Sequence, residues 1–385
     1  MIYPGKPLLC VERTYFGSGA LAALPGVLGE LGVSRALIVT DKGVAASGAL
    51  DLTIEHLKKA GIGVAVYDET QPEPGAEVAD GIVAQFAGDG VDGVVGLGGG
   101  SCLDTAKVVA VMLKHGGTLR DWLGQDKVKA PGLPMVLVPT TSGTGSECTP
   151  NALFIVDGEK QAVLSRYILP QAAVVDPDLT LSMPPKVTAA SGLDALIHAC
   201  ESYTSLGATP LTEVFSLRAV ELIAGAIRAA VWRGSDRKAR ADISLGSYLA
   251  GVAIANAGTT AVHALAYPLG GKYRIPHGVS NALMFPYVME WNIPADMEKF
   301  ARLAQAVRED VDGLPLREAA RRFLRGIESI IEDVGVPRTL DEVGIDRGEL
   351  PALVEGAARQ QRLLRNNPRS LSKEDMAAIY AKAWR

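Results

Sequence analysis

The stretch Val94–Lys107 reads VVGLGGGSCLDTAK and decides the fold of the first half of the chain. A β-rich run ends, the three consecutive glycines Gly98, Gly99 and Gly100 follow, and a helix-like segment begins. Glycines let a backbone approach a diphosphate closely, and the first turn of a helix offers N–H groups with a partial positive charge. Ser101 can cap the helix or donate its hydroxyl to phosphate. The stretch therefore predicts a phosphate-binding loop; the alternative is a tight strand–helix turn without a ligand.

This loop follows neither of the two common nucleotide-binding patterns. With Gly98 and Gly100 placed first in G-x-G-x-x-G, position 103 is leucine instead of glycine. The pattern G-x-x-x-x-G-K-[ST] is absent as well. The glycines therefore indicate phosphate binding without assigning the usual Rossmann or P-loop fold.

Two further polar segments fit a dinucleotide. Asp41 follows a strand-like run, where a carboxylate can accept hydrogen bonds from ribose hydroxyls and would repel a 2′-phosphate, which favours NAD over NADP. Its alternative is an ordinary loop or N-cap aspartate. The run PTTSGTGSE, Pro139–Glu147, places five hydroxyl side chains after another strand-like run. Because open α/β sheets bind ligands at the carboxyl ends of their strands, this run predicts a binding loop, with a plain Ser/Thr loop as the alternative.

Outward from the glycines, short β-rich runs alternate with helix-like segments. Strands are expected over 36–40, 63–67, 91–98 and 135–141, and helices over 43–60, 76–86 and 102–113. This rhythm predicts a parallel sheet with helices on both faces. The segments 153–156 and 172–176 are expected to form an added hairpin. After Met183-Pro184-Pro185 long helical patterns dominate, which predicts an α/β domain over 1–184 and an all-helical domain over 185–385.

Composition narrows the functional classes. The chain has 385 residues, 48% hydrophobic and 21% charged, with a formal net charge of -5. No basic block or basic–aromatic stripe appears, so we expect no nucleic-acid partner. The N-terminal sequence lacks the pattern of a signal peptide, and no apolar run reaches the roughly 18 residues of a membrane helix. The four cysteines form no C-x-x-C pair. We therefore expect a cytoplasmic protein with reduced thiols and no membrane contact.

One aspartate and three histidines stand out in the second half. Asp194 and His198 are four residues apart, so they share one face of a helix. His263 is expected on a second helix and His277 in a Pro-His-Gly turn. Each residue alone is more often a core or capping residue, but burying all four without a shared partner would be costly. A divalent cation resolves that cost, and this donor set suits zinc or iron(II) without choosing between them.

The motifs together closely resemble the iron-containing (group III) alcohol dehydrogenase family. The resemblance runs through GGGSCLDTAK, PTTSGTGSE, GLDALIHA, HALAYPLGGKYRIPHGVSNA and NNPRSLSKED, in that order and nearly end to end. It implies a dehydroquinate synthase-like architecture, with a dinucleotide-binding α/β domain followed by a helical domain. It also implies a metal-dependent, NAD(H)-linked enzyme that transfers hydride between a small alcohol and nicotinamide. The expected cofactors are NAD and Fe²⁺, with Zn²⁺ as the alternative, and the expected assembly is a homodimer or larger homo-oligomer.

The same resemblance assigns residues. Asp194, His198, His263 and His277 would bind the metal and, with Tyr267, form the catalytic set. The expected cofactor contacts are Asp41, Gly98, Gly99, Gly100, Ser101, Asp104, Thr140, Thr141, Thr144, Lys160 and Leu179. The expected substrate contacts are Asn151, Phe154, Tyr267 and Leu363.

Three departures from the family pattern affect these assignments. One is the segment 362–366, RLLRN, where the family often has small residues, so the pocket is expected to be reshaped and more cationic. Tyr267 stands where the family often has a second histidine, so its hydroxyl would have to serve any proton path. Glu73 stands where the family often has asparagine in a P-N-P turn, which should disfavour NADP further. Three alternatives stay open: a metal-independent reductase of the maleylacetate reductase type, a hydroxyacid dehydrogenase such as one acting on 4-hydroxybutyrate, and a non-catalytic NAD-binding protein.

Overall fold

The computed structural model describes residues 7–384 and divides into two compact units. One unit covers Leu9–Ser182 and contains every strand of the described chain. The other unit holds the chain from Met183 onwards and is built from helices. We call them the sheet unit and the helical unit. The division lies beside the Met183-Pro184-Pro185 segment, after which long helical patterns dominate the sequence.

A six-stranded sheet forms the centre of the sheet unit, and all its neighbouring strands are parallel, as the β–α rhythm predicted. In spatial order its strands are β1 (Arg13–Phe16), β9 (Ala172–Val175), β6 (Met135–Pro139), β4 (Gly93–Gly98), β2 (Arg35–Val39) and β3 (Gly63–Tyr67). A smaller sheet contains β5 (Gly124–Gln125), β8 (Glu159–Leu164) and β7 (Asn151–Val156). The helices of this unit are α1 (Leu24–Glu30), α2 (Lys42–Ala46), α3 (Ala49–Lys59), α4 (Ala76–Phe86), α5 (Gly100–His115) and α6 (Leu119–Trp122).

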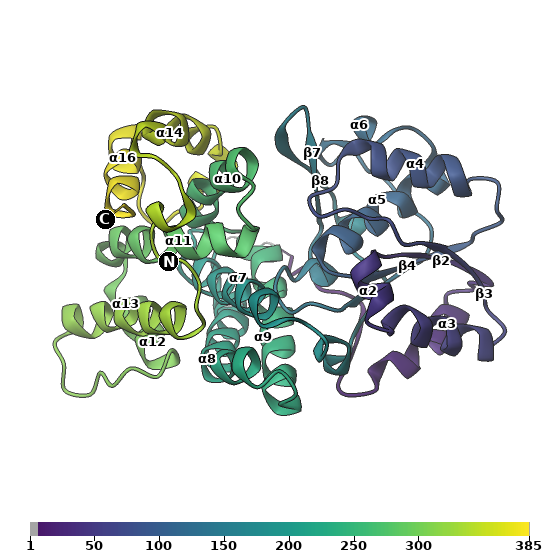
Figure 1. The fold of residues 1–385 in the computed structure, drawn as a ribbon, viewed down its shortest axis with the longest axis horizontal. Helices are drawn as coiled ribbons and strands as arrows, with labels where there is room; N and C mark the ends of the chain where they lie inside the picture. The colour runs from purple at the N-terminus through teal and green to yellow at the C-terminus, as the bar shows by residue number, and fades with distance from the viewer. Residues whose placement is uncertain (1–6, 385) are drawn as a thin grey trace. The chain divides into compact units, whose positions relative to one another are not determined.

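Successive residues of the central strands are buried alternately on one face and the other of the large sheet. From β2, Leu37 and Val39 pack in a core with α4 and α5, whereas Ala36 and Ile38 pack in a separate core with α1 and α3. Figure 1 shows α4 and α5 on one side of β2, β3 and β4 and α3 on the other. Because both faces are covered, the strands are almost uniformly apolar, as expected of a parallel sheet.

Two details of the predicted fold were wrong. The segments 153–156 and 172–176 do not form a hairpin, because β7 pairs antiparallel with β8 whereas β9 joins the large sheet between β1 and β6. The helix expected over 43–60 is two helices, α2 and α3. The break falls at Gly48, whose φ of 85° lies in the left-handed region and precedes the first turn of α3.

The helical unit confirms the prediction of an all-helical second half. Its helices are α7 (Pro185–Thr204), α8 (Pro210–Trp232), α9 (Arg237–Ala257), α10 (Ala261–Tyr273), α11 (His277–Asn292), α12 (Met297–Ala306), α13 (Leu316–Asp333), α14 (Leu350–Ala358), α15 (Gln361–Leu364) and α16 (Lys373–Lys382). A large hydrophobic core runs through them.

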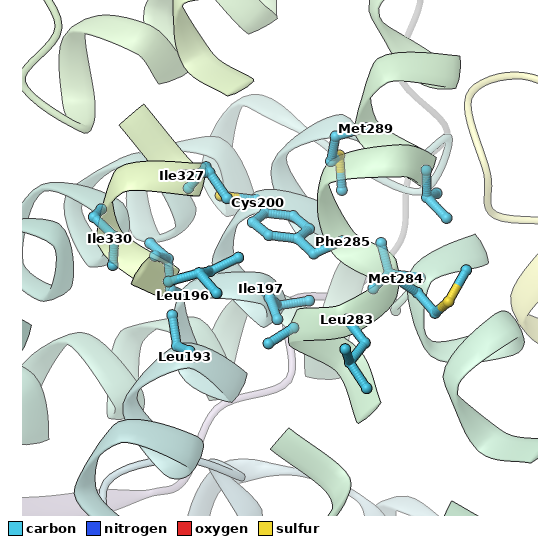
Figure 2. Close-up of a cluster of buried hydrophobic side chains, with 14 of the residues drawn as sticks. Leu193, Leu196, Ile197, Cys200, Leu283, Met284, Phe285, Met289, Ile327 and Ile330 are labelled. Atoms are coloured by element: carbon cyan, nitrogen blue, oxygen red, sulfur yellow. The ribbon is translucent and has the colours of Figure 1, made fainter. Parts of the chain in front are cut away.

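Helix α7 is buried nearly all round and has two different faces. Leu193, Leu196, Ile197 and Cys200 point towards Phe285 of α11 and the isoleucines of α13 (Figure 2). The residues between them, Asp194, His198 and Glu201, are also buried but polar. One face of α7 therefore builds the core, and the other brings charge into the interior of the unit.

Among the described residues, no single helix is long and apolar enough to cross a membrane. Helices α9 and α10 reach that length and composition only as a pair, and they are bent by 106° where they meet.

Candidate active site

Four side chains from three helices converge in the helical unit. Helix α7 supplies Asp194 and His198 one turn apart, α10 supplies His263, and His277 is the first residue of α11 instead of a turn residue. One ligand atom from each of the four lies within 4.8 Å of the others. Asp194, His198 and His263 are buried and His277 is partly exposed. The structure thus brings together all four residues that the sequence analysis grouped.

The distances within this cluster fit a divalent cation. His198 Nε2 and His263 Nε2 are 3.0 Å apart. Asp194 Oδ1 lies 3.8–3.9 Å from the Nε2 atoms of the three histidines. Ligands about 2.0–2.2 Å from a zinc-like ion lie roughly 3–3.6 Å from their neighbours, so the cluster has nearly the size that such an ion needs. Three imidazoles and one carboxylate are also the donors that zinc and iron(II) accept.

Asn281 contacts three members of this cluster. Its Nδ2 lies 2.7 Å from Asp194 Oδ1, 3.1 Å from His263 Nε2 and 3.2 Å from His277 Nε2. One amide group carries two N–H bonds, which are too few for three acceptors. Among the described residues, the buried Oδ1 of Asn281 has no hydrogen-bond partner. A cation between the four ligand atoms would compensate the buried charge of Asp194.

Electrostatics at Asp194 point the same way. Burial alone would raise the pKa of this carboxyl, but the neighbouring His198, His277 and His263 outweigh it and lower the pKa to about 2. Asp194 is therefore an ionised carboxylate in the interior of the helical unit. A carboxylate that stays ionised in the interior can serve as the anionic ligand of a divalent cation.

Sequence reasoning missed Glu201, which lies directly behind this cluster. It is buried on α7, and its Oε2 accepts a hydrogen bond from Nδ1 of His263. Burial raises the pKa of Glu201, and its electrostatic interaction with His263 in the protonated form together with this hydrogen bond lowers it more, so the net shift is downward. The available signal was its spacing, since Glu201 follows His198 by three residues and Asp194 by seven, on the same helix face.

Tyr267 borders the cluster of four ligand residues, whereas Leu363 is buried in the hydrophobic core. The Tyr267 ring centroid is 6.3 Å from that of His263 and 6.0 Å from that of His277, so this partly buried tyrosine borders the cluster. Leu363 is 1% exposed and belongs to the hydrophobic core. The structure gives Leu363 a packing role, and its contact with substrate stays a prediction without structural support.

In the sheet unit, the glycine loop joins β4 to α5. Gly98 ends the strand with a φ of 152°, Gly99 is the N-cap residue and Gly100 begins the helix. A Cβ on Gly100 would lie 2.8 Å from Thr144 Cγ2, and one on Gly99 would lie 3.3 Å from Thr141 Oγ1. The loop therefore needs glycine because the segment Pro139–Glu147, which we call the threonine loop, packs against it. Two of the segments predicted to bind the dinucleotide, the glycine loop and the threonine loop, are thus neighbours in space.

Ser101, Glu73 and Lys160 meet beside this loop. The hydroxyl of Ser101 accepts a hydrogen bond of 3.2 Å from the backbone N–H of Glu73. The Glu73 carboxylate in turn forms an ion pair of 3.4 Å with Lys160 on β8. Glu73 has a φ of 50°, in the left-handed region. Lys160, a surface charge by sequence alone, therefore lies in the same neighbourhood as Ser101.

Asp41 caps α2, which was the alternative interpretation of this residue. One carboxylate oxygen accepts a hydrogen bond of 2.9 Å from Val44 N, and the other accepts one of 3.2 Å from the Cys102 thiol. A role in selecting NAD stays a prediction. The cap fixes the carboxylate at the carboxyl end of β2, where the ribose contact was expected.

Asp104 and Lys107 form a buried polar network beneath the loop. Asp104 accepts hydrogen bonds from Ser146 Oγ and Leu153 N. The Lys107 ammonium lies 2.8 Å from Ser146 Oγ, 3.2 Å from Thr149 Oγ1 and 2.6 Å from the carbonyl oxygen of Asn151. Asp104, predicted to contact cofactor, therefore ties the threonine loop and β7 to α5, and its cofactor contact stays a prediction.

The remaining predicted residues have mixed environments. Thr140 is buried directly after β6, and Asn151 begins β7. Phe154 is 1% exposed inside the core beneath α5, and Leu179 is 8% exposed in the core on the opposite face of the sheet. These two side chains pack the fold, so the predicted substrate contact of Phe154 and the cofactor contact of Leu179 have no structural support.

The fold and these two sites are those of a metal-dependent, dinucleotide-linked oxidoreductase. Comparison with known proteins agrees. Residues 12–177 match the family described as "Iron-containing alcohol dehydrogenase", and residues 188–384 match "Fe-containing alcohol dehydrogenase family, C-terminal".

Individual relatives cover almost the whole chain. It is 42% identical over 375 residues to Long-chain-alcohol dehydrogenase 1 of Geobacillus thermodenitrificans, covering 96% of this chain and 95% of the relative. It is 35% identical over 370 residues to the NAD-dependent methanol dehydrogenase of Bacillus methanolicus, covering 95% and 97%. The solved structure of a 1,3-propanediol oxidoreductase matches with a TM-score of 0.96 and 36% identity, covering 98% of this chain and 99% of that one.

The chain therefore belongs to the iron-containing alcohol dehydrogenase family. It is accordingly an oxidoreductase of the alcohol dehydrogenase class, in a family that uses NAD and a metal, which confirms the resemblance found in the sequence.

Proposed function

We propose that this protein interconverts primary alcohols and their aldehydes, using NAD(H) and one divalent cation held by Asp194, His198, His263 and His277. The observation that carries the proposal is the convergence of four ligand atoms within 4.8 Å in the interior of the helical unit. The donor set fits iron(II) or zinc, and the family favours iron.

The proposed chemical roles divide between the metal cluster of the helical unit and the glycine loop of the sheet unit. A bound divalent cation supplies Lewis-acid chemistry that polarises a carbonyl or alcohol oxygen. Asp194 contributes the one negative charge of the ligand set, which leaves the loaded site net positive towards a substrate oxygen. Tyr267, bordering the histidines, is placed to accept or donate a hydrogen bond along a proton path. A bound NAD(H) would supply hydride chemistry at C4 of its nicotinamide.

For the cofactor, we propose that Gly99, Gly100 and Ser101 hold the diphosphate of NAD at the start of α5. The N–H groups of a helix N-terminus and the absence of Cβ atoms support this role. Asp41 would bind the ribose of the adenosine and repel a 2′-phosphate.

The relatives suggest the substrate class. Their names refer to long-chain alcohols, methanol and 1,3-propanediol, and all of these are primary alcohols. We therefore propose an unbranched primary alcohol. On family likeness alone, we also propose a homodimer or larger homo-oligomer that works in the cytoplasm.

Metal depletion tests this function. The purified protein is treated with a chelator, its metal content is measured, and NADH oxidation is followed with a series of aldehydes before and after addition of Fe²⁺ or Zn²⁺. Loss of turnover with the metal and its return on reconstitution are expected. Undiminished turnover in metal-free protein would contradict the proposal and favour a metal-independent reductase. Tight NAD binding without turnover of any alcohol or aldehyde would favour a non-catalytic protein.

A further inference from the structure

Glu201 is a buried carboxylate to which the proposed chemistry gives no task. Its side chain is 0% exposed, and it lies on the polar face of α7 with Asp194 and His198. An ionised group in such a place is tolerated only where donors surround it. The structure supplies these donors from one short segment, residues 260–263, at the beginning of α10.

The two oxygens of Glu201 make different contacts. Oε1 accepts hydrogen bonds of 3.0 Å from Thr260 N, 2.6 Å from Thr260 Oγ1 and 2.9 Å from Val262 N. It thereby caps the first turn of α10, where backbone N–H groups have no partner within the helix. Oε2 accepts a hydrogen bond from Nδ1 of His263. One carboxylate thus holds both the start of a helix and a side chain in its first turn.

The contact with Oε2 decides which nitrogen of His263 carries the proton. A carboxylate only accepts, so Nδ1 of His263 must be the donor. In a neutral imidazole, Nε2 then has an unshared electron pair. Nε2 of His263 is the atom that faces His198 Nε2 and Asn281 in the candidate metal cluster. Metal-binding histidines commonly need such a second contact to fix the ring and its tautomer.

We infer that Glu201 is a positioning residue, which sets the orientation and tautomer of His263 so that Nε2 binds the cation. The inference rests on the proposed metal-binding function. A purely structural alternative is that Glu201 only caps α10. The two roles are separable because they use different oxygens. The cap also has independent support, since Asn367 Oδ1 accepts the N–H of Ala261 at 3.4 Å.

Glu201→Gln separates these roles. Glutamine keeps a carbonyl oxygen for Thr260 and Val262 but replaces Oε2 with an NH₂ group that donates. Nδ1 of His263 must then accept, which places the proton on Nε2 and blocks the metal. We expect Zn²⁺ affinity, measured by competition with a chromogenic chelator, to fall about 10–100-fold. The unfolding temperature of the metal-free protein should stay close to that of the wild type. The absorption spectrum of bound Co²⁺ should also change, because one nitrogen ligand is displaced.

Two further variants complete the test. Ser202→Ala removes the 2.8 Å hydrogen bond to Ser216 from the next buried residue of α7, so it disturbs the helix without touching His263. Its Zn²⁺ affinity should match the wild type. Glu201→Asp keeps an acceptor-only carboxylate and should bind Zn²⁺ more tightly than Glu201→Gln.

The results separate the positioning role of Glu201 from the proposed metal-binding function. Equal Zn²⁺ affinity in Glu201→Gln and wild type would show that Oε2 does not influence metal binding. An equal loss in Ser202→Ala would show that any disturbance of α7 weakens the site, and a Glu201→Gln chain that cannot fold would show that the carboxylate is needed for the fold itself. Each of these results would overturn the inference. Wild-type protein that binds no Zn²⁺ or Co²⁺ would instead overturn the proposed function.

Discussion

The two candidate sites are built in opposite ways. In the helical unit, the metal cluster is an arrangement of charged and polar side chains, and its chemistry would disappear with any one of them. In the sheet unit, the glycine loop proposed to hold the diphosphate depends on the absence of side chains, because a Cβ on Gly99 or Gly100 would press against Thr141 or Thr144. Substitutions should therefore act by removing a ligand in the first site and by adding volume in the second.

The two units also treat a buried carboxylate differently. Asp194 is surrounded by three imidazoles, and they lower its pKa to about 2 in spite of its burial. Glu147, buried at the end of the threonine loop, has its pKa raised by burial to about 7, with only a partial offset from its own backbone N–H and from Lys107. Asp194 therefore stays ionised, whereas Glu147 takes up a proton near neutral pH, which makes its contribution to stability sensitive to pH.

The largest effect is expected from His263→Ala. Removing this ligand takes one nitrogen from the cation and leaves Oε2 of Glu201 without its partner, so metal retention and turnover should be lost together. Turnover should fall by about 10³-fold or more, since metal catalysis contributes several kcal/mol. Metal content by mass spectrometry and NADH oxidation measure both quantities.

The matched control is His56→Ala, on α3 of the sheet unit, which should keep both metal and activity. NAD affinity should be unchanged in both variants, because the glycine loop belongs to the sheet unit. Retained metal in His263→Ala would show that the four residues do not act as one ligand set.

The same contrast explains what the sequence could predict. Glycines at a strand–helix junction are a local signal, so residues 98–101 predicted the junction between β4 and α5 and much of the parallel sheet around it. Asp194 and His198 share a helix face, and apolar surroundings made His263 and His277 conspicuous. Glu201 was missed because a glutamate on a helix looks like an ordinary surface charge until the start of α10 is known to lie against it.

Strand pairing was less predictable for the same reason. The segment 172–176 was assigned to a hairpin by proximity in sequence, yet its run of small apolar residues suits the interior of the large sheet, where β9 lies. The partner of β7 is Glu159–Leu164, a run that begins with charged residues and looks like a loop. Strand β1 alternates half-buried and exposed residues and gave too weak a signal to identify. Pairing between distant segments is a tertiary property that local patterns do not contain.

Glu147→Gln tests whether the buried Glu147 carboxyl destabilises the fold once it is ionised. Because the folded-state pKa of about 7 is above the ordinary 4.5, the folded chain binds this proton more tightly between these values. Its contribution to stability therefore falls as pH rises through this window. Glutamine removes the charge, so the free energy of unfolding of the metal-free protein should rise by roughly 1–3 kcal/mol at pH 8. At pH 5 the variant and the wild type should be nearly equal. Urea denaturation at both pH values measures the difference, and an equal change at both would contradict the assignment.

The smallest effect, and the most direct test of the backbone-built site, is expected from Gly100→Ala. The added Cβ would lie 2.8 Å from Thr144 Cγ2, so the threonine loop or the first turn of α5 must move where the diphosphate is proposed to bind. NAD affinity by fluorescence titration should fall about tenfold, or about 1.4 kcal/mol, with metal content unchanged. Gly81→Ala is the matched control, since this glycine lies in α4 with open space around its Cβ position. It should leave NAD affinity intact and stabilise the helix slightly. If both variants bound NAD like the wild type, the crowding at Gly100 would be only structural, and the diphosphate would have to bind elsewhere.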